Sequence, residues 1–311
     1  MPEKFFAGKN FFKKFVAAII AGAIIFFAPG KFSSSAEAVA PLFEDTELYW
    51  LFSDDNYSKY FVPDSVRVVK KAKTDSGREV ATEIEAWTKT TYTPGGAAAT
   101  IRDYGIDSII PDPQKLSYSL ALFRITPQNR TIQYAREDFY DANNNIIWSK
   151  ADGRVKEINS QAFDEDFYVA IVDEVFRQGE VERKKASDRW IDLWSKTDSE
   201  GNTVSVSADT TTMQMKGTNL IVWEWQESKT GKGQITEIRF MKKAVNLLQG
   251  TEKIISGETW TLATKIWQEL DDEYGNAYRM ISNDEPAYKG LVRLRVYVKE
   301  HPDWVTRYSI K

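Results

Sequence analysis

The chain has 311 residues, a formal net charge of −4 and no cysteine. Its length exceeds that of one typical domain, and the absence of cysteine excludes a disulfide framework, a thiolate nucleophile and a cysteine metal site. A mildly acidic chain lacks the clustered Lys and Arg that bind phosphate polyanions, so we expect no nucleic-acid partner. Ten tryptophans, 14 tyrosines and 17 phenylalanines supply apolar area for two cores.

The first residues have the layout of a secretory signal peptide, with lysines, the apolar run 15–28 and small residues that end at Ala38. The run is shorter than the roughly 20 residues of a spanning helix, although an uncleaved anchor is an alternative. Cleavage after Ala40 would place Pro41 beside the scissile bond, where its fixed φ hinders an extended substrate. We therefore predict a signal peptide over 1–38, cleaved after Ala38.

This leader predicts an extracytoplasmic protein, in the periplasm or at the cell surface. Without cysteine the chain has no acceptor for a bacterial lipoprotein anchor. We therefore expect contact with the membrane only through the leader during export.

Two later stretches share one order of elements, which predicts an internal duplication. Each opens with an aromatic strand, continues through a polar turn and a strand to Asp-Ser or Asp-Thr, and reaches a strand that carries tryptophan. The first unit is predicted over 39–178 and the second over 189–311, with a charged linker over 179–188. Chance alignment of alternating strands is the alternative.

Within the units, period-two alternation predicts half-buried strands over 116–122 and 234–240. Asn-rich and Gly-Asn turns then predict hairpins over 139–149 and 270–282, because Asn and Gly tolerate positive φ.

Two segments depart from the repeat. The first unit has extra residues over 88–115, which are either a binding insertion or an exposed excursion with a short helix. The second unit is similarly irregular over 247–265.

Each unit is predicted to end with one helix. Apolar residues follow helical spacing over 163–175, and the acidic first turn suits the helix dipole. In the second unit Asp284 is the predicted N-cap, Pro286 takes an early position and Pro302 ends the helix, although the alternation over 293–298 also fits a strand. The predicted fold class is α+β, with two similar units, each a twisted antiparallel β-sheet with one packed C-terminal helix.

This order of features resembles the surface-adhesin protein E family, in two tandem copies that cover most of the chain after the leader. The matching residues are Trp50, Tyr60, Asp64, Ser65, Trp87, Tyr140, Asp141 and Ser149, and in the second copy Trp194, Asp209, Thr210, Trp225, Asp271 and Ser282. The second copy lacks the paired aromatic before its Asp. The resemblance implies an antiparallel sheet with one helix per unit, in bacterial envelope proteins of which some bind host extracellular-matrix ligands.

The sequence offers little catalytic chemistry. Its single histidine, His301, has no triad or zinc motif beside it, and there is no nucleophile elbow or phosphate-binding glycine loop. Residues 141–145 place oxygen ligands as a calcium loop does, but Ile146 stands where that loop needs glycine. We therefore expect no catalytic residue, no metal and no cofactor.

The tryptophans are the remaining candidates for recognition. Trp223 and Trp225 fall on one face of a predicted strand, where they can bind sugar rings or peptide side chains, with core packing as the alternative. With Tyr104 in the first unit's insertion, they are the candidate partner-binding residues. The predicted function is a non-enzymatic, adhesin-like envelope protein that binds a protein or glycan at the cell surface. The alternatives are an exported carbohydrate-processing hydrolase that uses paired carboxylates and an envelope-assembly scaffold.

Overall fold

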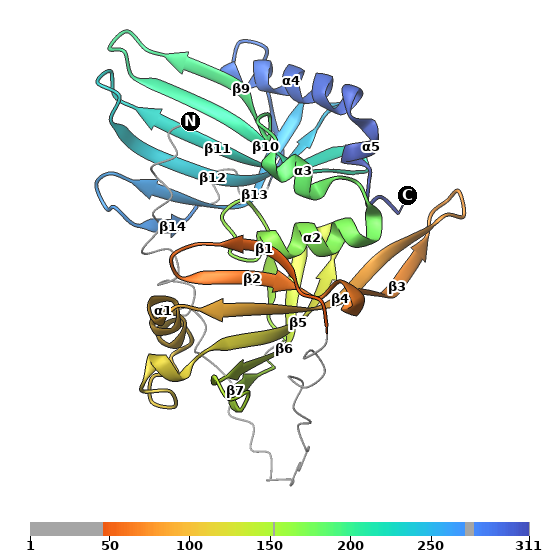
Figure 1. Cartoon of the computed structure of the whole chain (residues 1–311). Coiled ribbons are helices and arrows are strands. Elements are labelled where there is room, and N and C mark those ends of the chain that lie inside the picture. The colour runs from red at the N-terminus through yellow and green to blue at the C-terminus, as the bar shows by residue number, and fades with distance from the viewer. Residues whose placement is uncertain (1–45, 152, 271–276, 311) are drawn as a thin grey trace, which may run out of the picture.

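The computed structural model describes residues 46–151, 153–270 and 277–310, which form two antiparallel β-sheets and a few helices (Figure 1). The predicted leader with Ala38 lies outside the described residues, as does the turn at 271–276. The structure is mostly antiparallel sheet, which fits the predicted α+β class only broadly. Across these described ranges, no helix is both long enough and apolar enough to span a membrane.

The first sheet has eight strands in the order β1-β2-β4-β5-β6-β7, with β3 paired to β4 and β8 paired to β6. The long strand β4 pairs with two strands on the same edge, since its first half pairs with β3 and its second half pairs with β2. The strands are β1 (Tyr49–Ser53), β2 (Tyr57–Phe61), β3 (Arg67–Lys73), β4 (Glu79–Tyr92), β5 (Tyr118–Thr126), β6 (Thr131–Tyr140), β7 (Ile146–Lys150) and β8 (Val155–Glu157).

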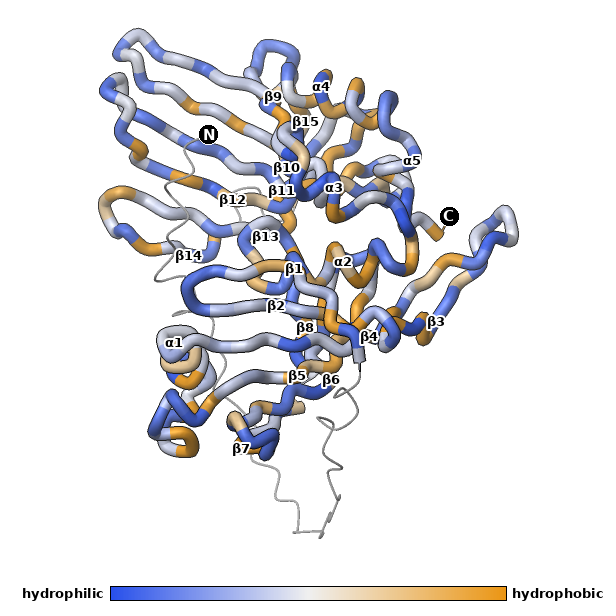
Figure 2. Tube along the Cα trace, in the orientation of Figure 1, coloured by the Kyte–Doolittle hydropathy of each residue, from blue (hydrophilic) through white to orange (hydrophobic). Residues whose placement is uncertain are grey.

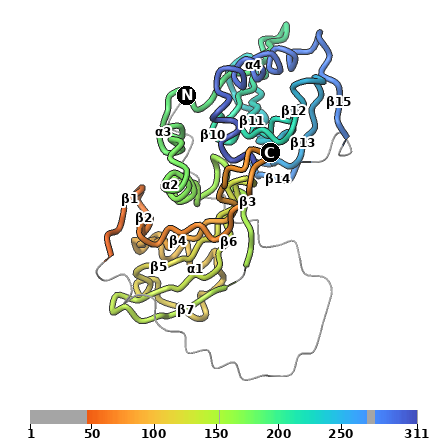
Figure 3. The backbone as a smooth tube through the Cα atoms, turned by 90° about the vertical axis from the view of Figure 1, so that its right-hand side faces the viewer, coloured from red at the N-terminus to blue at the C-terminus, as the bar shows by residue number. Residues whose placement is uncertain are grey.

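Three helices belong to this part of the chain: α1 (Pro94–Tyr104), α2 (Glu165–Phe176) and α3 (Glu180–Lys185). Helix α1 starts with Pro at an early position and a Thr93 side chain that accepts from the backbone N–H of Gly96, and it ends at Gly105 with φ 65°. Helix α2 confirms the predicted helix at 163–175 and has acidic residues in its first turn. It lies on the side of the first sheet that faces the second sheet (Figures 1 and 3).

The second sheet is a meander of seven strands in the order β14-β13-β12-β11-β10-β9, with β15 paired to β13. Its strands are β9 (Trp190–Thr197), β10 (Thr203–Lys216), β11 (Asn219–Lys229), β12 (Ile235–Asn246), β13 (Thr251–Thr261), β14 (Trp267–Glu269) and β15 (Arg279–Met280). The tips of the β9–β10 and β11–β12 hairpins are hydrophilic, whereas α2 is largely hydrophobic (Figure 2). Helix α4 (Pro286–Glu300) packs through Leu291 and Leu294 on one face of this sheet, and the short helix α5 (Pro302–Val305) follows it.

Several predicted elements are confirmed. Strands β5 and β12 occupy the two segments predicted from alternation. Strands β6 and β7 pair around a turn in which Asp141 accepts from the backbone of Asn143 and Asn145, and Asn144 has φ 64°. Helix α4 is present where a helix or a strand was expected.

Three expectations are wrong in detail. Glu285, not Asp284, is the N-cap of α4, because Pro286 takes the first helical position. In the described residues β14 and β15 pair with β13 and not with one another, so no hairpin joins them. The stretch expected to be irregular over 247–265 contains the regular strand β13, which pairs with β12 along its length.

The charged segment between the two sheets carries α3 and a buried ion network. Glu180 is fully buried, and the Nε of Arg307 donates to its Oε1 at 2.6 Å. The buried Arg130 donates to the carbonyl of Thr211 at 2.8 Å, which ties the turn after β5 to β10. Arg189 bonds both Glu165 and Asp209, at 2.7 and 2.8 Å. Charge in this segment therefore holds the two sheets together.

Candidate functional site

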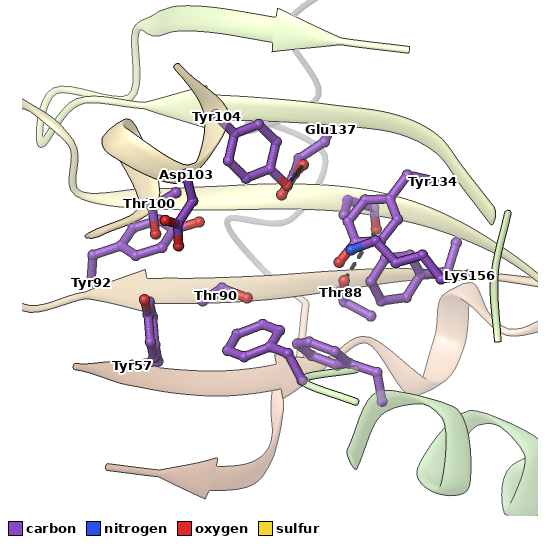
Figure 4. A pocket seen from close by; sticks show the side chains of 14 residues that line it. Tyr57, Thr88, Thr90, Tyr92, Thr100, Asp103, Tyr104, Tyr134, Glu137 and Lys156 are labelled. Atoms are coloured by element: carbon purple, nitrogen blue, oxygen red, sulfur yellow. Dashed lines mark hydrogen bonds between the residues drawn. The ribbon is translucent and has the colours of Figure 1, made fainter. Parts of the chain in front are cut away.

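A strip of short side chains separates the two helices that pack on the first sheet. Cross-strand register places Thr88 opposite Ala121 and Ala121 opposite Glu137 in one row. Helix α2 packs over the rows on one side of this strip, around Phe123, and α1 packs over the rows on the other side, around Phe139. Because threonine and alanine fill less space than the residues beside them, a pocket remains between the helices (Figure 4).

This pocket has a cavity volume of about 50 Å³ and a polar, aromatic lining. Four tyrosines line it from different elements: Tyr57 from β2, Tyr92 from β4, Tyr104 from α1 and Tyr134 from β6. A buried water molecule needs about 10–15 Å³ of cavity volume, so this cavity has room for roughly four atoms the size of a water oxygen. The pocket therefore has room only for a small chemical group.

Glu137 is the buried acid of this pocket. Glu137 is 7% exposed, and the hydroxyl of Tyr104 donates a hydrogen bond to its Oε2 at 2.6 Å. Burial raises the pKa of Glu137 to about 7, against the lowering effect of the Tyr104 hydrogen bond and of Lys156 and Lys150. The carboxyl is therefore divided between its two protonation states near neutral pH.

Other polar groups around the pocket hold one another in place. The hydroxyl of Tyr134 donates to Oδ1 of Asp164 at 2.6 Å, and Lys156 lies 3.5 Å from the other oxygen of Asp164 and over the Tyr134 ring. Tyr92 shares a 2.7 Å hydrogen bond with Ser119. These bonds fix the orientation of the aromatic rings.

Sequence reasoning found Tyr104 but missed Glu137 and Tyr134. Strand β6 contains a bulge at Ala135, because Leu122 pairs with Arg136 while the next residue of β5 pairs with Tyr134. The bulge shifts the period-two pattern by one residue and turns Glu137 inward. The sequence signal for this site is a glutamate among the inward-facing aromatic residues of β6. The bulge hides this signal because it interrupts the period-two alternation.

A second group of aromatic side chains lies on the second sheet, on the face opposite α4. Trp225 pairs with Phe240, Phe240 with Glu258, and Glu258 with Glu269, so these four residues form one row across β11, β12, β13 and β14. In the adjacent row Trp260 stands opposite Trp267. We call Trp225, Phe240, Trp260 and Trp267 the aromatic face.

The rings of the aromatic face contact one another and remain partly accessible. Trp225 lies 5.9 Å from Phe240 and 6.1 Å from Trp267 between ring centroids. Trp225, Trp260 and Trp267 are each of intermediate burial. Burial and the nearby carboxylate of Glu269 raise the pKa of Glu258. The face therefore combines accessible indoles with two adjacent acids.

Trp223 has a different environment from Trp225, although both lie on β11. It is 8% exposed, stacks on Phe240 at 4.5 Å and donates its indole N–H to Glu157 of β8 at 3.2 Å. Lys242 pairs with the same carboxylate at 2.7 Å. Trp223 therefore takes part in the contact between the two sheets.

The three sequence-predicted residues are not brought together, because Tyr104 lies in the pocket of the first sheet and Trp223 and Trp225 lie on the second. His301 ends α4 and stacks on Tyr297 at 4.2 Å. Within the described ranges, no group of three or more His, Asp or Glu side chains is placed to hold a metal ion.

Comparison with known proteins adds no family to these observations. No model of a known protein family matches the chain, and no curated protein matches its sequence. The assignment of a function therefore depends on the pocket and on the aromatic face.

Proposed function

We propose that the chain is an exported, non-enzymatic binding protein of the bacterial envelope that recognises a glycan through the aromatic face of the second sheet. The observation that carries the proposal is the row of Trp225, Phe240, Glu258 and Glu269. Sugar rings pack their C–H faces on indole, and their hydroxyl groups donate to carboxylates. A sheet face that offers both groups side by side matches that chemistry.

The arrangement of the two acids favours binding over hydrolysis. A glycosidase holds its two carboxyl groups on opposite sides of the scissile bond. Glu258 and Glu269 are instead direct cross-strand neighbours on one face, so both would approach a bound sugar from the same side. In the first sheet, the cavity of about 50 Å³ beside Glu137 is too small for a glycosidic bond with a sugar on each side.

The proposal includes the origin and location of the protein. The matching strand order of the two sheets, each with a helix after its last long strand, supports a duplication of an adhesin-like unit with one C-terminal helix. In that duplication α1 is an insertion in the first copy. The leader supports export to the periplasm or the surface.

The test uses the purified exported protein on an array of neutral and acidic oligosaccharides, followed by titration of the best ligands. We expect Trp225→Ala and Trp267→Ala to weaken binding at least about 10-fold, as for a central aromatic contact. The matched control is Trp50→Ala, which removes an exposed tryptophan on the edge strand of the first sheet and leaves the affinity unchanged.

Two results would overturn the proposal. Retention of a protein ligand but of no oligosaccharide would replace the glycan with a protein partner. Release of new reducing ends, abolished by Glu258→Gln, would replace binding with hydrolysis. Cell fractionation tests the location, and recovery of the protein in the cytoplasm alone would refute export.

A further inference from the structure

The pocket beside Glu137 is separate from the aromatic face. It lies on the other sheet and its room is small, since a cavity of about 50 Å³ accepts a group of roughly four non-hydrogen atoms. Whatever occupies it must therefore enter as a compact head group.

The acid of this pocket makes no direct ion pair with a described residue. In the part of the chain that the structure describes, no lysine or arginine nitrogen lies within 4 Å of the Glu137 carboxylate, and the hydrogen bond that it accepts comes from a neutral hydroxyl. Lys156 of β8, which lines the same pocket, is paired with Asp164 at 3.5 Å. Lys150 of β7 lies over the ring of Tyr104 at 5.2 Å. A buried carboxylate without a counter-ion is costly, and a bound cation removes that cost.

The walls of the pocket also favour a cation. Rings of Tyr57, Tyr92, Tyr104 and Tyr134 surround the space (Figure 4), and the faces of aromatic rings attract positive charge. A second acid, Asp103 of α1, lines the same pocket. An anion would meet two carboxyl groups, and the one lysine of the lining, Lys156, is already paired with Asp164. A neutral ligand would leave Glu137 without a counter-ion.

We propose that this pocket binds the substituted ammonium group of a small organic cation, with Glu137 as its counter-ion and the tyrosine rings as its walls. The free amine and the head group of a membrane lipid share this chemistry. A nitrogen atom and three of its substituents are four non-hydrogen atoms and fill the available room, and a primary ammonium group additionally donates to hydroxyl groups of the lining.

Binding is coupled to protonation, because the cation requires the ionised carboxylate. Four groups from the surrounding elements act on the Glu137 carboxyl: Tyr104 of α1 through its hydrogen bond, Asp164 beside α2, Lys156 of β8 and Lys150 of β7. Two more charged residues lie nearby, since Asp103 lines the same pocket and Arg154 lines a neighbouring pocket that also includes Glu137. With a pKa of about 7, the carboxyl is mostly neutral at pH 5.5 and mostly ionised at pH 8. We expect affinity to rise at least 10-fold over this interval and then to level off.

Calorimetric titration of the whole exported protein with tetramethylammonium, choline and ethanolamine tests the site, with acetate as the anionic probe. Glu137→Gln is expected to weaken binding of each cation at least 10-fold and to remove the pH dependence. Glu79→Gln, which changes an exposed glutamate of the same sheet, leaves both unchanged. Trp225→Ala also leaves cation binding unchanged, which separates this site from the glycan site.

A second variant keeps the test decisive if Glu137→Gln folds poorly. Tyr104→Phe retains the ring and removes the hydrogen bond to the carboxylate, so we expect the midpoint of the pH dependence to move upward while binding persists at pH 8. Vesicles of phosphatidylcholine or phosphatidylethanolamine distinguish the source, since binding to vesicles with no response to free choline or ethanolamine identifies a lipid head group. Cation binding that is equal in Glu137→Gln, tighter binding of acetate, or no binding of any cation or vesicle at pH 8 would overturn the proposal.

Discussion

Glu180→Ala removes a carboxylate around which two buried arginines gather. The side chains of Glu180 and Arg307 are both 0% exposed and are joined by the 2.6 Å bond from Nε to Oε1. A nitrogen of Arg130 lies 3.6 Å from the other oxygen, and the hydroxyl of Tyr308 also donates to Glu180. The substitution leaves the guanidinium of Arg307 without its carboxylate in a region that water does not reach.

Removal of one partner from a buried ion pair costs about 3–5 kcal/mol in the free energy of unfolding. For domains of 150–250 residues each kcal/mol lowers the melting temperature by about 2–4 °C, so we expect a decrease of about 6–20 °C. Thermal and urea unfolding, followed by circular dichroism and tryptophan fluorescence, measures this loss. The double variant Glu180→Met with Arg307→Met is expected to recover part of it, because apolar replacement of both partners is often close to neutral.

An exposed ion pair of the first sheet provides the control. Lys71 and Glu79 lie 3.2 Å apart with both side chains 55% exposed, so Glu79→Ala is expected to cost less than about 1 kcal/mol. A loss in Glu180→Ala no larger than in this control would refute the structural role assigned to the buried network.

Three further predictions concern the pocket, α1 and the leader. Burial raises the pKa of Glu137 to about 7 in the folded protein from its ordinary 4.5. The folded state therefore binds the carboxyl proton of Glu137 more tightly than the unfolded state does. The stability that this protonation contributes is fully present below about pH 4.5. The free energy of unfolding therefore falls by about 3 kcal/mol as the pH rises to about 7; urea unfolding should show this fall in the wild type and not in Glu137→Gln. Gly96→Ala places a Cβ 2.1 Å from a backbone oxygen and is expected to lower the free energy of unfolding by more than about 2 kcal/mol. Gly77→Ala, which has open space but a positive φ, is the control and is expected to cost about 1 kcal/mol. Equal losses of stability in thermal unfolding would contradict the close approach at Gly96. N-terminal sequencing of the exported protein should begin one residue after Ala38, and an intact leader in the envelope fraction would instead support an anchor.

The elements that the sequence predicts correctly are those with a local cause. Helices α2 and α4 carry apolar residues at helical spacing with an acidic or proline start, and the β6–β7 hairpin has Asn144 at the position with positive φ. Each of these signals lies within about fifteen residues of chain, so no distant contact is needed to read it.

The features that the sequence does not predict depend on residues far apart in the chain. The bulge at Ala135 depends on how β5 and β6 align, and it alone turns Glu137 toward the pocket. Strands β14 and β15 are too short to show alternation, and both take their pairing from β13. The burial of Glu180 within the charged segment could not be read locally, because its partner, Arg307, lies far along the chain.

The position of Tyr308 has a consequence for the order in which the protein folds. This residue follows α4, yet its ring belongs to the core of the first sheet and packs on Phe176 at 4.8 Å. During synthesis from the N-terminus, every strand of the first sheet is made before Tyr308. The first sheet therefore completes its core only after the second sheet has been synthesised, and a fragment that contains the first sheet alone is expected to refold less stably than the same residues within the whole protein.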